Sequence, residues 1–329
     1  MDKFRSTATA RDLGATIVAL EVPGVTFDAV AVSDGGEGFR SSFDGEVVRL
    51  MARTAWGHWR YVPLTVISSP SETVGILEVA EIVGRAPGLT VTSSMALRAS
   101  SAGVGDAIVA SAGCGVTRLM VGCGGSATSD GGEGCFDVLE RYPGRAVRLV
   151  AATDITADFF GALRYCEQKG VAAGDVALVG ERLERLAARY ESVSGHDVRA
   201  TSRTGAAGGL SGALFAAGAK LVSGFDEVAR ANDLRSRLDA ASTVITGEGR
   251  FDAGSLEGKV VESVCGLTTE RHRVLVVCGS SDPAAVRELT RRYPWAQVRD
   301  LVSRFGQRRA VEDTLACVGA VVEDFLRGG

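Results

Sequence analysis

The sequence predicts an α/β fold, because short and almost continuously apolar runs alternate along the chain with segments of helical periodicity. Residues 147–152 and 273–279 are apolar runs that end in small or polar residues, which is typical of strands buried on both faces of a parallel sheet. Residues 176–192 carry apolar side chains at helical spacing with charges between them, and predict a surface helix. The 329 residues are enough for two domains of roughly 150 residues each.

The other elements follow in chain order. An apolar run at residues 27–33 predicts an early strand, and residues 118–122 predict a second short strand. Residues 97–112 predict a helix after a break, with N–H groups near its start, at residues 100–105, that could receive an anion. Residues 244–252 predict a strand that delivers polar side chains into a glycine turn.

Two copies of Asp-Gly-Gly-Glu-Gly follow apolar runs, at residues 34–38 and 130–134, and the second copy follows a glycine-rich turn. Glycine lets the backbone approach a ligand and adopt positive φ, and successive N–H groups in such a turn form an anion-binding concavity. An acid beside a phosphate site is commonly a Mg²⁺ ligand. The motifs therefore predict a phosphate and metal site at strand ends, although either copy alone is equally consistent with a structural turn.

Composition narrows the class of protein. With 46% hydrophobic residues, 23% charged residues and a net charge of −4, the chain has no basic stripe with interleaved aromatics, so a nucleic-acid partner is not predicted. No apolar run reaches roughly 18 residues and no leader is recognisable, so no membrane partner is predicted and the cytoplasm is the default location. Seven dispersed cysteines indicate buried thiols in a reducing compartment. The three histidines have no partner at metal-ligand spacing, which argues against a histidine-ligated metal or a Ser-His-Asp hydrolase.

Lysine is rare in this chain. Among 36 basic residues the lysines are Lys3, Lys169, Lys220 and Lys259, and all but Lys220 lie in distinctive motifs. Lysine is a compact and mobile point charge that suits a moving phosphoryl group, whereas arginine is a planar fork. The alternative for any one of them is a solvated surface charge.

Further motifs lie at residues 152–156, 167–170, 205–210, 244–252 and 256–259. In this order they resemble the glycerate kinase family, specifically the bacterial type that phosphorylates glycerate at its 2-position with ATP.

The resemblance covers nearly the whole chain and implies a two-domain architecture. A discontinuous Rossmann-like parallel-sheet domain would be built from both chain ends, residues 1–50 and 240–329, with an inserted α/β domain at residues 51–239.

The resemblance also implies the roles of particular residues. Catalytic candidates are Asp34, Asp130, Asp154 and Lys169, and the candidate Mg²⁺ ligands are Asp34 and Asp130. The candidates for binding the acceptor acid are Asp2, Lys3, Arg5, Glu37, Arg250 and Asp252. The candidates for binding ATP are Gly124, Gly125, Ser126, Thr128, Gly208, Gly209, Glu248 and Lys259. Because ligands bind beyond the carboxyl ends of strands in open α/β sheets, the acids that follow apolar runs are expected to converge on one cleft. A structural ion pair between Glu248 and Arg250 is the alternative for those two residues.

The chain departs from the family pattern in several loops. The family begins with an apolar strand leading into Pro-Asp-Ser/Lys-Phe-Lys-Gly, whereas this chain opens at residues 1–6 with Arg5 in place of a lysine. We expect either a start downstream of the natural one or a truncated member. Loops at residues 157–159, 165–167 and 202–205 also differ, and Thr-Asn-Asp is replaced by the sequence at residues 128–130.

Two hypotheses follow. The first is an ATP- and Mg²⁺-dependent kinase acting on glycerate or a similar small hydroxy acid, with a homodimer as the candidate assembly. The second is a catalytically impaired paralogue that binds nucleotide or a small acid without phosphoryl transfer. For the kinase, Asp34→Asn or Asp130→Asn is expected to lower kcat far more than stability.

Overall fold

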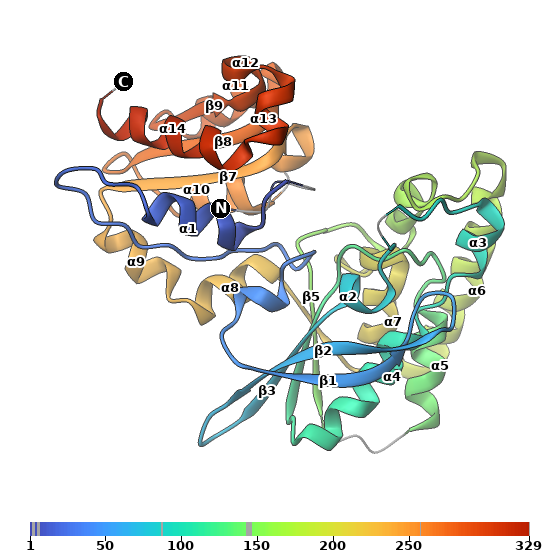
Figure 1. Cartoon of the computed structure of the whole chain (residues 1–329). Helices are drawn as coiled ribbons and strands as arrows, with labels where there is room; N and C mark the ends of the chain where they lie inside the picture. The colour runs from blue at the N-terminus through green and yellow to red at the C-terminus, as the bar shows by residue number, and fades with distance from the viewer. Residues whose placement is uncertain (2–3, 5–6, 87, 143–146, 257, 329) are drawn as a thin grey trace. The chain divides into compact units, whose positions relative to one another are not determined.

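The computed structural model describes residues 1, 4, 7–86, 88–142, 147–256 and 258–328, and divides into two compact units (Figure 1). The terminal unit comprises Met1–Asp34 and Phe225–Gly329, and the inserted unit comprises Gly35–Gly224. The chain passes between them at residues 34/35 and 224/225, whereas the sequence predicted boundaries near 50 and 240.

Two local features account for the difference in boundaries. Residues 46–53 form the first strand of the inserted unit's sheet, so that unit begins before residue 50. Residues 234–240 form a helix that is tied to the terminal unit by an ion pair between Arg237 and Asp28, with an Nη1–Oδ1 distance of 2.6 Å.

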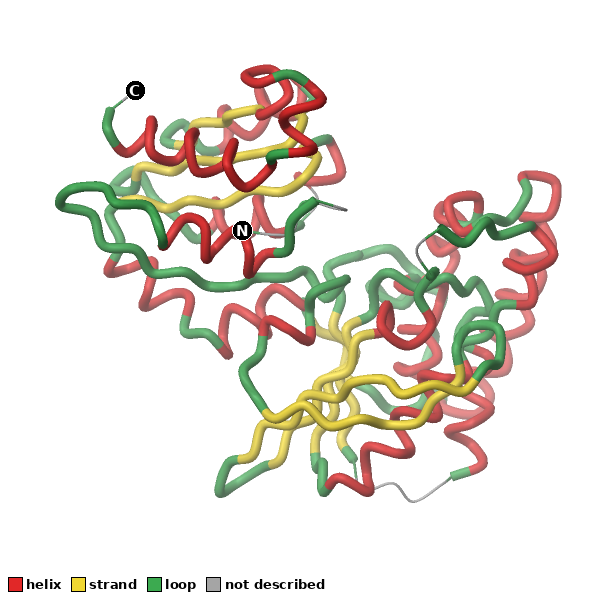
Figure 2. Tube along the Cα trace, viewed as in Figure 1, coloured by secondary structure: helices red, strands yellow, loops and turns green. Residues whose placement is uncertain are grey.

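The inserted unit contains a six-stranded sheet in the order β1-β2-β3-β4-β5-β6 (Figure 2). The strands are β1 (Glu46–Arg53), β2 (Trp59–Ser68), β3 (Thr73–Glu78), β4 (Arg118–Gly122), β5 (Arg148–Ala152) and β6 (Lys220–Val222). The pairs β1–β2 and β2–β3 are antiparallel, and β3 to β6 are parallel. The carboxyl ends of β3, β4, β5 and β6 therefore share one edge of the sheet, where ligands bind in open α/β folds.

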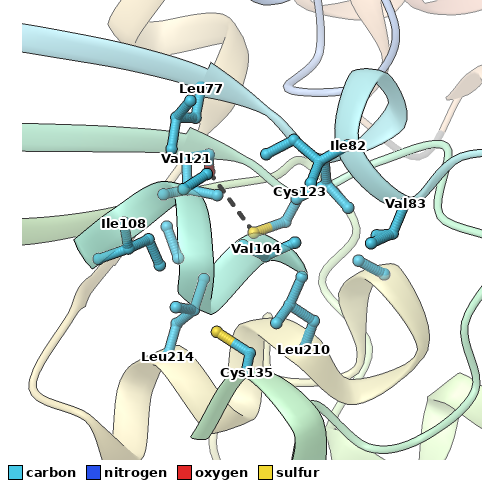
Figure 3. Packing of buried hydrophobic residues seen from close by; sticks show 14 of the residues in the cluster. Leu77, Ile82, Val83, Val104, Ile108, Val121, Cys123, Cys135, Leu210 and Leu214 are labelled. Carbon is cyan, nitrogen blue, oxygen red and sulfur yellow. Dashed lines mark hydrogen bonds between the residues drawn. The ribbon is translucent and has the colours of Figure 1, made fainter. Parts of the chain in front are cut away.

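Helices pack on this sheet around two apolar cores. They are α2 (Val79–Val83), α3 (Ser93–Arg98), α4 (Ala102–Ser111), α5 (Glu133–Arg141), α6 (Val176–Ser194) and α7 (Leu210–Ala216). Figure 3 shows side chains of α2, α4, α5 and α7 meeting those of β3 and β4, with Cys123 in the middle. A second core surrounds the inner face of α6, where Tyr190 and Phe159 are fully buried.

The terminal unit has a three-stranded parallel sheet in the order β7-β8-β9. Its strands are β7 (Thr243–Phe251), β8 (Arg273–Ser281) and β9 (Ala296–Asp300). Its helices are α1 (Ala10–Val18), α8 (Gly224–Ala231, at the junction), α9 (Leu234–Ala240), α10 (Val260–Gly266), α11 (Pro283–Arg292), α12 (Leu301–Phe305), α13 (Gln307–Glu312) and α14 (Thr314–Leu326). Buried side chains of α1, α14 and β8 form one core, while α10 contacts β7 and α11 contacts β9.

The structure confirms the predicted fold class of parallel-sheet α/β units, one of them built from both chain ends. The predicted strands at residues 118–122, 147–152 and 273–279 correspond to β4, β5 and β8, and the helix at residues 176–192 corresponds to α6. The three strands were predictable because parallel strands buried on both faces leave a continuous apolar run in the sequence.

Three predicted elements are wrong in detail. Residues 27–33 form no strand, since this segment carries the chain towards the inserted unit without pairing. The helix predicted at residues 97–112 is interrupted at residues 99–101, between α3 and α4. The predicted turn within residues 244–252 does not form, because β7 continues to Phe251 and pairs with β8 along its length.

The thiols agree with the expectation of buried cysteines. All seven cysteines are free, and every one except Cys114 is buried. Among the described residues, no helix is long and apolar enough to cross a membrane.

Candidate active site

Three strand ends lie side by side in the inserted unit. Glu78 at the end of β3 is the register partner of Gly122 at the end of β4, and Gly122 is the partner of Ala152 at the end of β5. The glycine turn that follows Gly122 and the loop that contains Asp154 therefore leave the sheet at neighbouring points.

The first Asp-Gly-Gly-Glu-Gly motif packs directly on the turn after β4. A Cβ on Gly124 would lie 2.4 Å from Gly36 Cα, and one on Gly35, where φ is +88°, would lie 2.7 Å from the Ala152 carbonyl oxygen. Contacts this close leave no room for a side chain. The structure thus brings part of the first motif onto the glycine turn of the second, in backbone contact that requires glycine.

A buried carboxylate holds this first loop in place. Glu78 is 3% exposed, and its oxygens accept hydrogen bonds from the N–H groups of Gly38, at 3.0 Å, and Arg40, at 3.1 Å. The guanidinium of Arg40 in turn forms two hydrogen bonds with Glu81, at 2.6 and 2.8 Å. Sequence reasoning missed Glu78 and Arg40, because neither lies at a recognisable motif spacing from its partners. Glu37, which lies between Gly36 and Gly38 in the sequence, is exposed.

Asp130, in the second motif, organises the surrounding backbone. Its Oδ2 accepts hydrogen bonds from Ser101 N at 2.7 Å, Ser101 Oγ at 2.8 Å and Gly134 N at 3.2 Å, and its Oδ1 accepts one from Gly132 N at 3.2 Å. The side chain is buried at 4% exposure. The anion at the start of α4, where the sequence predicted an anion site, is thus this carboxylate.

These four hydrogen bonds change the expectation for Asp130→Asn. An amide cannot accept all four bonds, so we expect the free energy of unfolding to fall by about 2 to 3 kcal/mol, in addition to any loss of turnover. Urea unfolding would measure this. Asp137→Asn is the control, because Asp137 lies on α5 with its side chain 39% exposed, in an ion pair with Arg189, and should change stability by less than about 1 kcal/mol. Equal stability of the two variants would contradict the assigned role.

The turn at residues 205–209 closes over the second motif. Gly208 and Gly209 have φ of +72° and +90°, and Gly131 N donates a hydrogen bond to Gly208 O at 3.0 Å. A Cβ on Gly208 would lie 2.1 Å from the Thr128 carbonyl oxygen. The structure therefore places Gly208 against Thr128, both of them residues predicted to bind ATP, and places Gly209 against Gly131 of the second motif.

Lys169, at the end of the short helix Glu167–Lys169, contacts the glycine turn after β4 and the turn at residues 205–209. Its Nζ donates hydrogen bonds to Ser126 Oγ at 2.9 Å and to the Thr128 carbonyl oxygen at 2.6 Å. Burial lowers the pKa of Lys169 to about 8, although the nearby Cys166 and Asp130 oppose the shift. The Oγ1 of Thr128, whose carbonyl oxygen Lys169 contacts, is fully buried and has no hydrogen-bond partner among the described residues. An ammonium held against glycine-rich backbone, with an unpartnered hydroxyl on the same loop, fits an anion with acceptor oxygens.

Asp154 follows β5 and faces an arginine that the sequence did not single out. Arg203 Nη1 lies 3.7 Å from Asp154 Oδ1 and donates a hydrogen bond to the Thr153 carbonyl oxygen. Arg203 has φ of +74°, which a non-glycine residue rarely adopts. The pair comes from segments about 50 residues apart in sequence, so no local pattern could have indicated it.

The remaining predicted residues belong to the terminal unit or lie outside the described residues. Glu248 and Arg250 lie in β7. Among the described residues, the ion-pair partner of Arg250 is Asp252, at an Nε–Oδ2 distance of 3.4 Å, and not Glu248. Lys259 precedes α10, with its Nζ beside Gly254.

Asp34 is the last residue of the terminal unit. The predicted acceptor-site residues Asp2, Lys3 and Arg5 lie outside the described residues. Convergence of Asp34 and Glu248 with Asp130 and Asp154 stays a prediction.

The acidic donor set bears on the predicted Mg²⁺ site. Within the described part of the chain, no group of three or more His, Cys, Asp or Glu side chains could hold an ion, and both oxygens of Asp130 are occupied by hydrogen bonds. The residues present therefore do not fit a preformed protein cage. Asp34 stays a predicted ligand.

By its fold, the chain is a two-unit α/β protein whose glycine-rich loops gather at the carboxyl ends of parallel strands in the inserted unit. The same fold occurs in the crystal structure of a candidate glycerate kinase 2 from Salmonella typhimurium LT2. That structure matches with a TM-score of 0.72 and 22% sequence identity, over 99% of this chain and 97% of the other.

Sequence comparison gives the family. The model of the glycerate kinase family matches residues 1–141 and 141–324, so the chain belongs to the glycerate kinase family. An uncharacterised protein of Mycobacterium bovis is 34% identical over 281 residues, covering 80% of this chain and 73% of the relative. A glycerate kinase of Bacillus subtilis is 29% identical over 273 residues, covering 72% and 71%. A glycerate 2-kinase of Escherichia coli is 30% identical over 216 residues, covering 55% and 57%.

Proposed function

We propose that this protein phosphorylates glycerate, or a similar small hydroxy acid, with ATP. Family membership supports a kinase, and the Bacillus subtilis and Escherichia coli relatives are glycerate kinases. The single observation that carries the proposal is the ammonium of Lys169, held between the turn at residues 124–128 and the turn at residues 205–209, with the unpartnered hydroxyl of Thr128 on the first of these turns.

The chemistry of phosphoryl transfer suits such a site. Transfer of a γ-phosphoryl group requires positioning and charge neutralisation more than covalent work by the protein. In the proposal, Lys169 donates a hydrogen bond to a phosphoryl oxygen, and the glycine turns let the phosphates approach the backbone closely. Mg²⁺, when bound with the nucleotide, would neutralise charge on the phosphates.

The acceptor hydroxyl needs a base and the acceptor carboxylate needs a cation. Asp34 and Asp154 are the proposed pool for the base, which would contribute roughly 10²- to 10⁴-fold to the rate. Arg203, beside Asp154, joins Arg250 as a candidate cation, because a guanidinium fork matches a carboxylate.

The pKa of Lys169 gives a pH dependence. Since burial lowers this pKa to about 8, we expect kcat/KM to fall as the pH rises through about 8, where the free enzyme loses the ammonium. Stability should move the opposite way. The folded pKa lies below the value of 10.5 for an exposed lysine, so the unfolded chain binds more protons between these values and stability rises with pH across that window. A pH profile of kcat/KM, with thermal melts at each pH, would check both. A flat rate profile from pH 7 to 10 would contradict the role of Lys169.

A direct assay tests the proposed function. ADP release from Mg²⁺-ATP is measured with D-glycerate, L-glycerate and glycolate, and phosphoglycerate is detected as product. Turnover with a glycerate enantiomer supports the proposal. Nucleotide binding, seen as thermal stabilisation by ATP, without turnover of any acid would overturn it in favour of the catalytically impaired paralogue. A fully populated site at 100 times Kd adds about 2.7 kcal/mol.

A further inference from the structure

A second concave site lies in the inserted unit, away from the glycine loops. Its cavity has a volume of about 830 Å³ and is lined by polar and charged side chains, Ser71, Glu72, Arg118, Arg148 and Lys220, and by an apolar floor that includes Val147, Leu149 and Val150. This volume lies in the range of cavities that bind small molecules.

The cavity carries an excess of positive charge. Arg118 and Arg148 are register partners at the starts of β4 and β5, so their side chains leave the same face of the sheet as neighbours. Like charges at such positions destabilise a sheet unless an anion lies between them. Among the lining residues Glu72 is the single acid; it pairs with Arg148 and lies 3.9 Å from Arg118.

Lys220 adds a third cation. It begins β6 as the register partner of Val150, and its side chain is exposed. Among the described residues Lys220 forms no ion pair, and the lining of the cavity contains three cations and one carboxylate. The lining residues therefore carry a net charge of about +2, which a ligand with about two negative charges would neutralise.

The position of the cavity separates it from the candidate active site. Arg118 is the first residue of β4 and Gly122 is the last, so the two sites lie at opposite ends of this strand, about 13 Å apart along its axis. An anion in the cavity could not occupy the cluster around Lys169.

We propose that this cavity binds a small organic phosphate. Two guanidinium groups are suited to phosphate oxygens in a forked arrangement, and Lys220 supplies a mobile point charge. The apolar floor would contact a carbon skeleton, which inorganic phosphate lacks. The site has no role in the proposed phosphoryl transfer and stands whether or not glycerate is the substrate.

Binding of 3-phosphoglycerate to the full chain tests the proposal, by isothermal titration calorimetry without ATP. The two probes, 3-phosphoglycerate and inorganic phosphate, are titrated into the wild type, the double variant Arg148→Ala/Lys220→Ala, and Lys169→Met. The last of these variants removes the cation of the candidate active site. Arg308→Ala is the control, because Arg308 lies on α13 with its side chain 88% exposed. We expect Lys169→Met and Arg308→Ala to retain binding at the cavity, and the double variant to bind there about tenfold or more weakly.

Three outcomes would overturn the proposal. They are undiminished binding by the double variant, loss of all binding in Lys169→Met, and inorganic phosphate binding as tightly as 3-phosphoglycerate. If the double variant does not fold, Lys220→Ala alone decides, because this exposed side chain pairs with no described acid. Unchanged affinity in that variant would overturn the role of the third cation.

Discussion

Replacement of Lys169 by methionine is expected to lower kcat for phosphoryl transfer by about 10²- to 10³-fold, the usual cost of removing one hydrogen-bond donor that stabilises transition-state charge. Methionine is close in length to the aliphatic stem of lysine and cannot donate from its end. The two oxygens that Lys169 contacts, Ser126 Oγ and Thr128 O, stay in place. Steady-state kinetics with Mg²⁺-ATP and glycerate would measure the loss.

Stability separates this prediction from simple unfolding. Burial already disfavours the charged form of Lys169, so removing the charge offsets part of the loss of its two hydrogen bonds, and the free energy of unfolding should fall by less than about 2 kcal/mol. Arg308→Met, at an exposed position of α13, is the matched loss of a cation and should leave kcat unchanged. A kcat for Lys169→Met within threefold of the wild type would show that the ammonium does not face the reacting phosphate.

Gly208→Ala is expected to lower the free energy of unfolding by about 3 to 4 kcal/mol, because two costs combine at this position. Its φ of +72° is unfavourable for a residue with a side chain, and the new Cβ would lie 2.1 Å from the Thr128 carbonyl oxygen. That oxygen belongs to the backbone and cannot turn aside as a flexible side chain would. Chemical denaturation would measure the effect.

Gly195→Ala is the matched control for backbone conformation. Gly195 has φ of +71° at the end of α6, and a Cβ there would meet nothing within 4 Å. It should cost about 1 kcal/mol, from positive φ alone. The difference between the two variants then measures the close packing of residues 205–209 on the second glycine motif. Equal losses would show that this packing is unimportant.

The elements that the sequence predicted correctly share a physical cause. Strands β4, β5 and β8 each contain a stretch that is buried on both faces, so the residues of that stretch form a continuous apolar run. Helix α6 has one buried and one exposed face, which imposes the helical period on its sequence.

The errors also have local causes. The apolar run at residues 27–33 resembles a strand, but pairing depends on a neighbouring strand that no local pattern reveals. Helix α3 ends at Arg98 and α4 begins at Ala102, although the apolar pattern runs across the break. The break exposes Ser101 N–H and Oγ to Asp130, a contact across 29 residues of sequence.

The candidate site could be predicted as a set of motifs but not as a set of contacts. Glycines at residues 35, 124 and 208 were recognisable in sequence, because close backbone approach requires them. Glu78, Arg40 and Arg203 were missed, since each acts on a partner that only tertiary structure brings near. Asp130 was recognised as important, but its partners show a scaffolding role that residue type alone did not indicate.

Ala207 gives the turn at residues 205–209 a further property. Together with Gly208 and Gly209 it forms three successive left-handed residues, with φ of +53° at the alanine, and its methyl group is buried in the main core of the inserted unit. The unfavourable conformation is therefore imposed when the unit folds, before any ligand arrives. A phosphate that binds against this turn would meet a rigid surface and would lose little affinity to ordering it. In the proposed kinase, preorganisation of this kind would favour fast exchange of one nucleotide for the next, because no loop would have to close or reopen at this side of the site in each cycle.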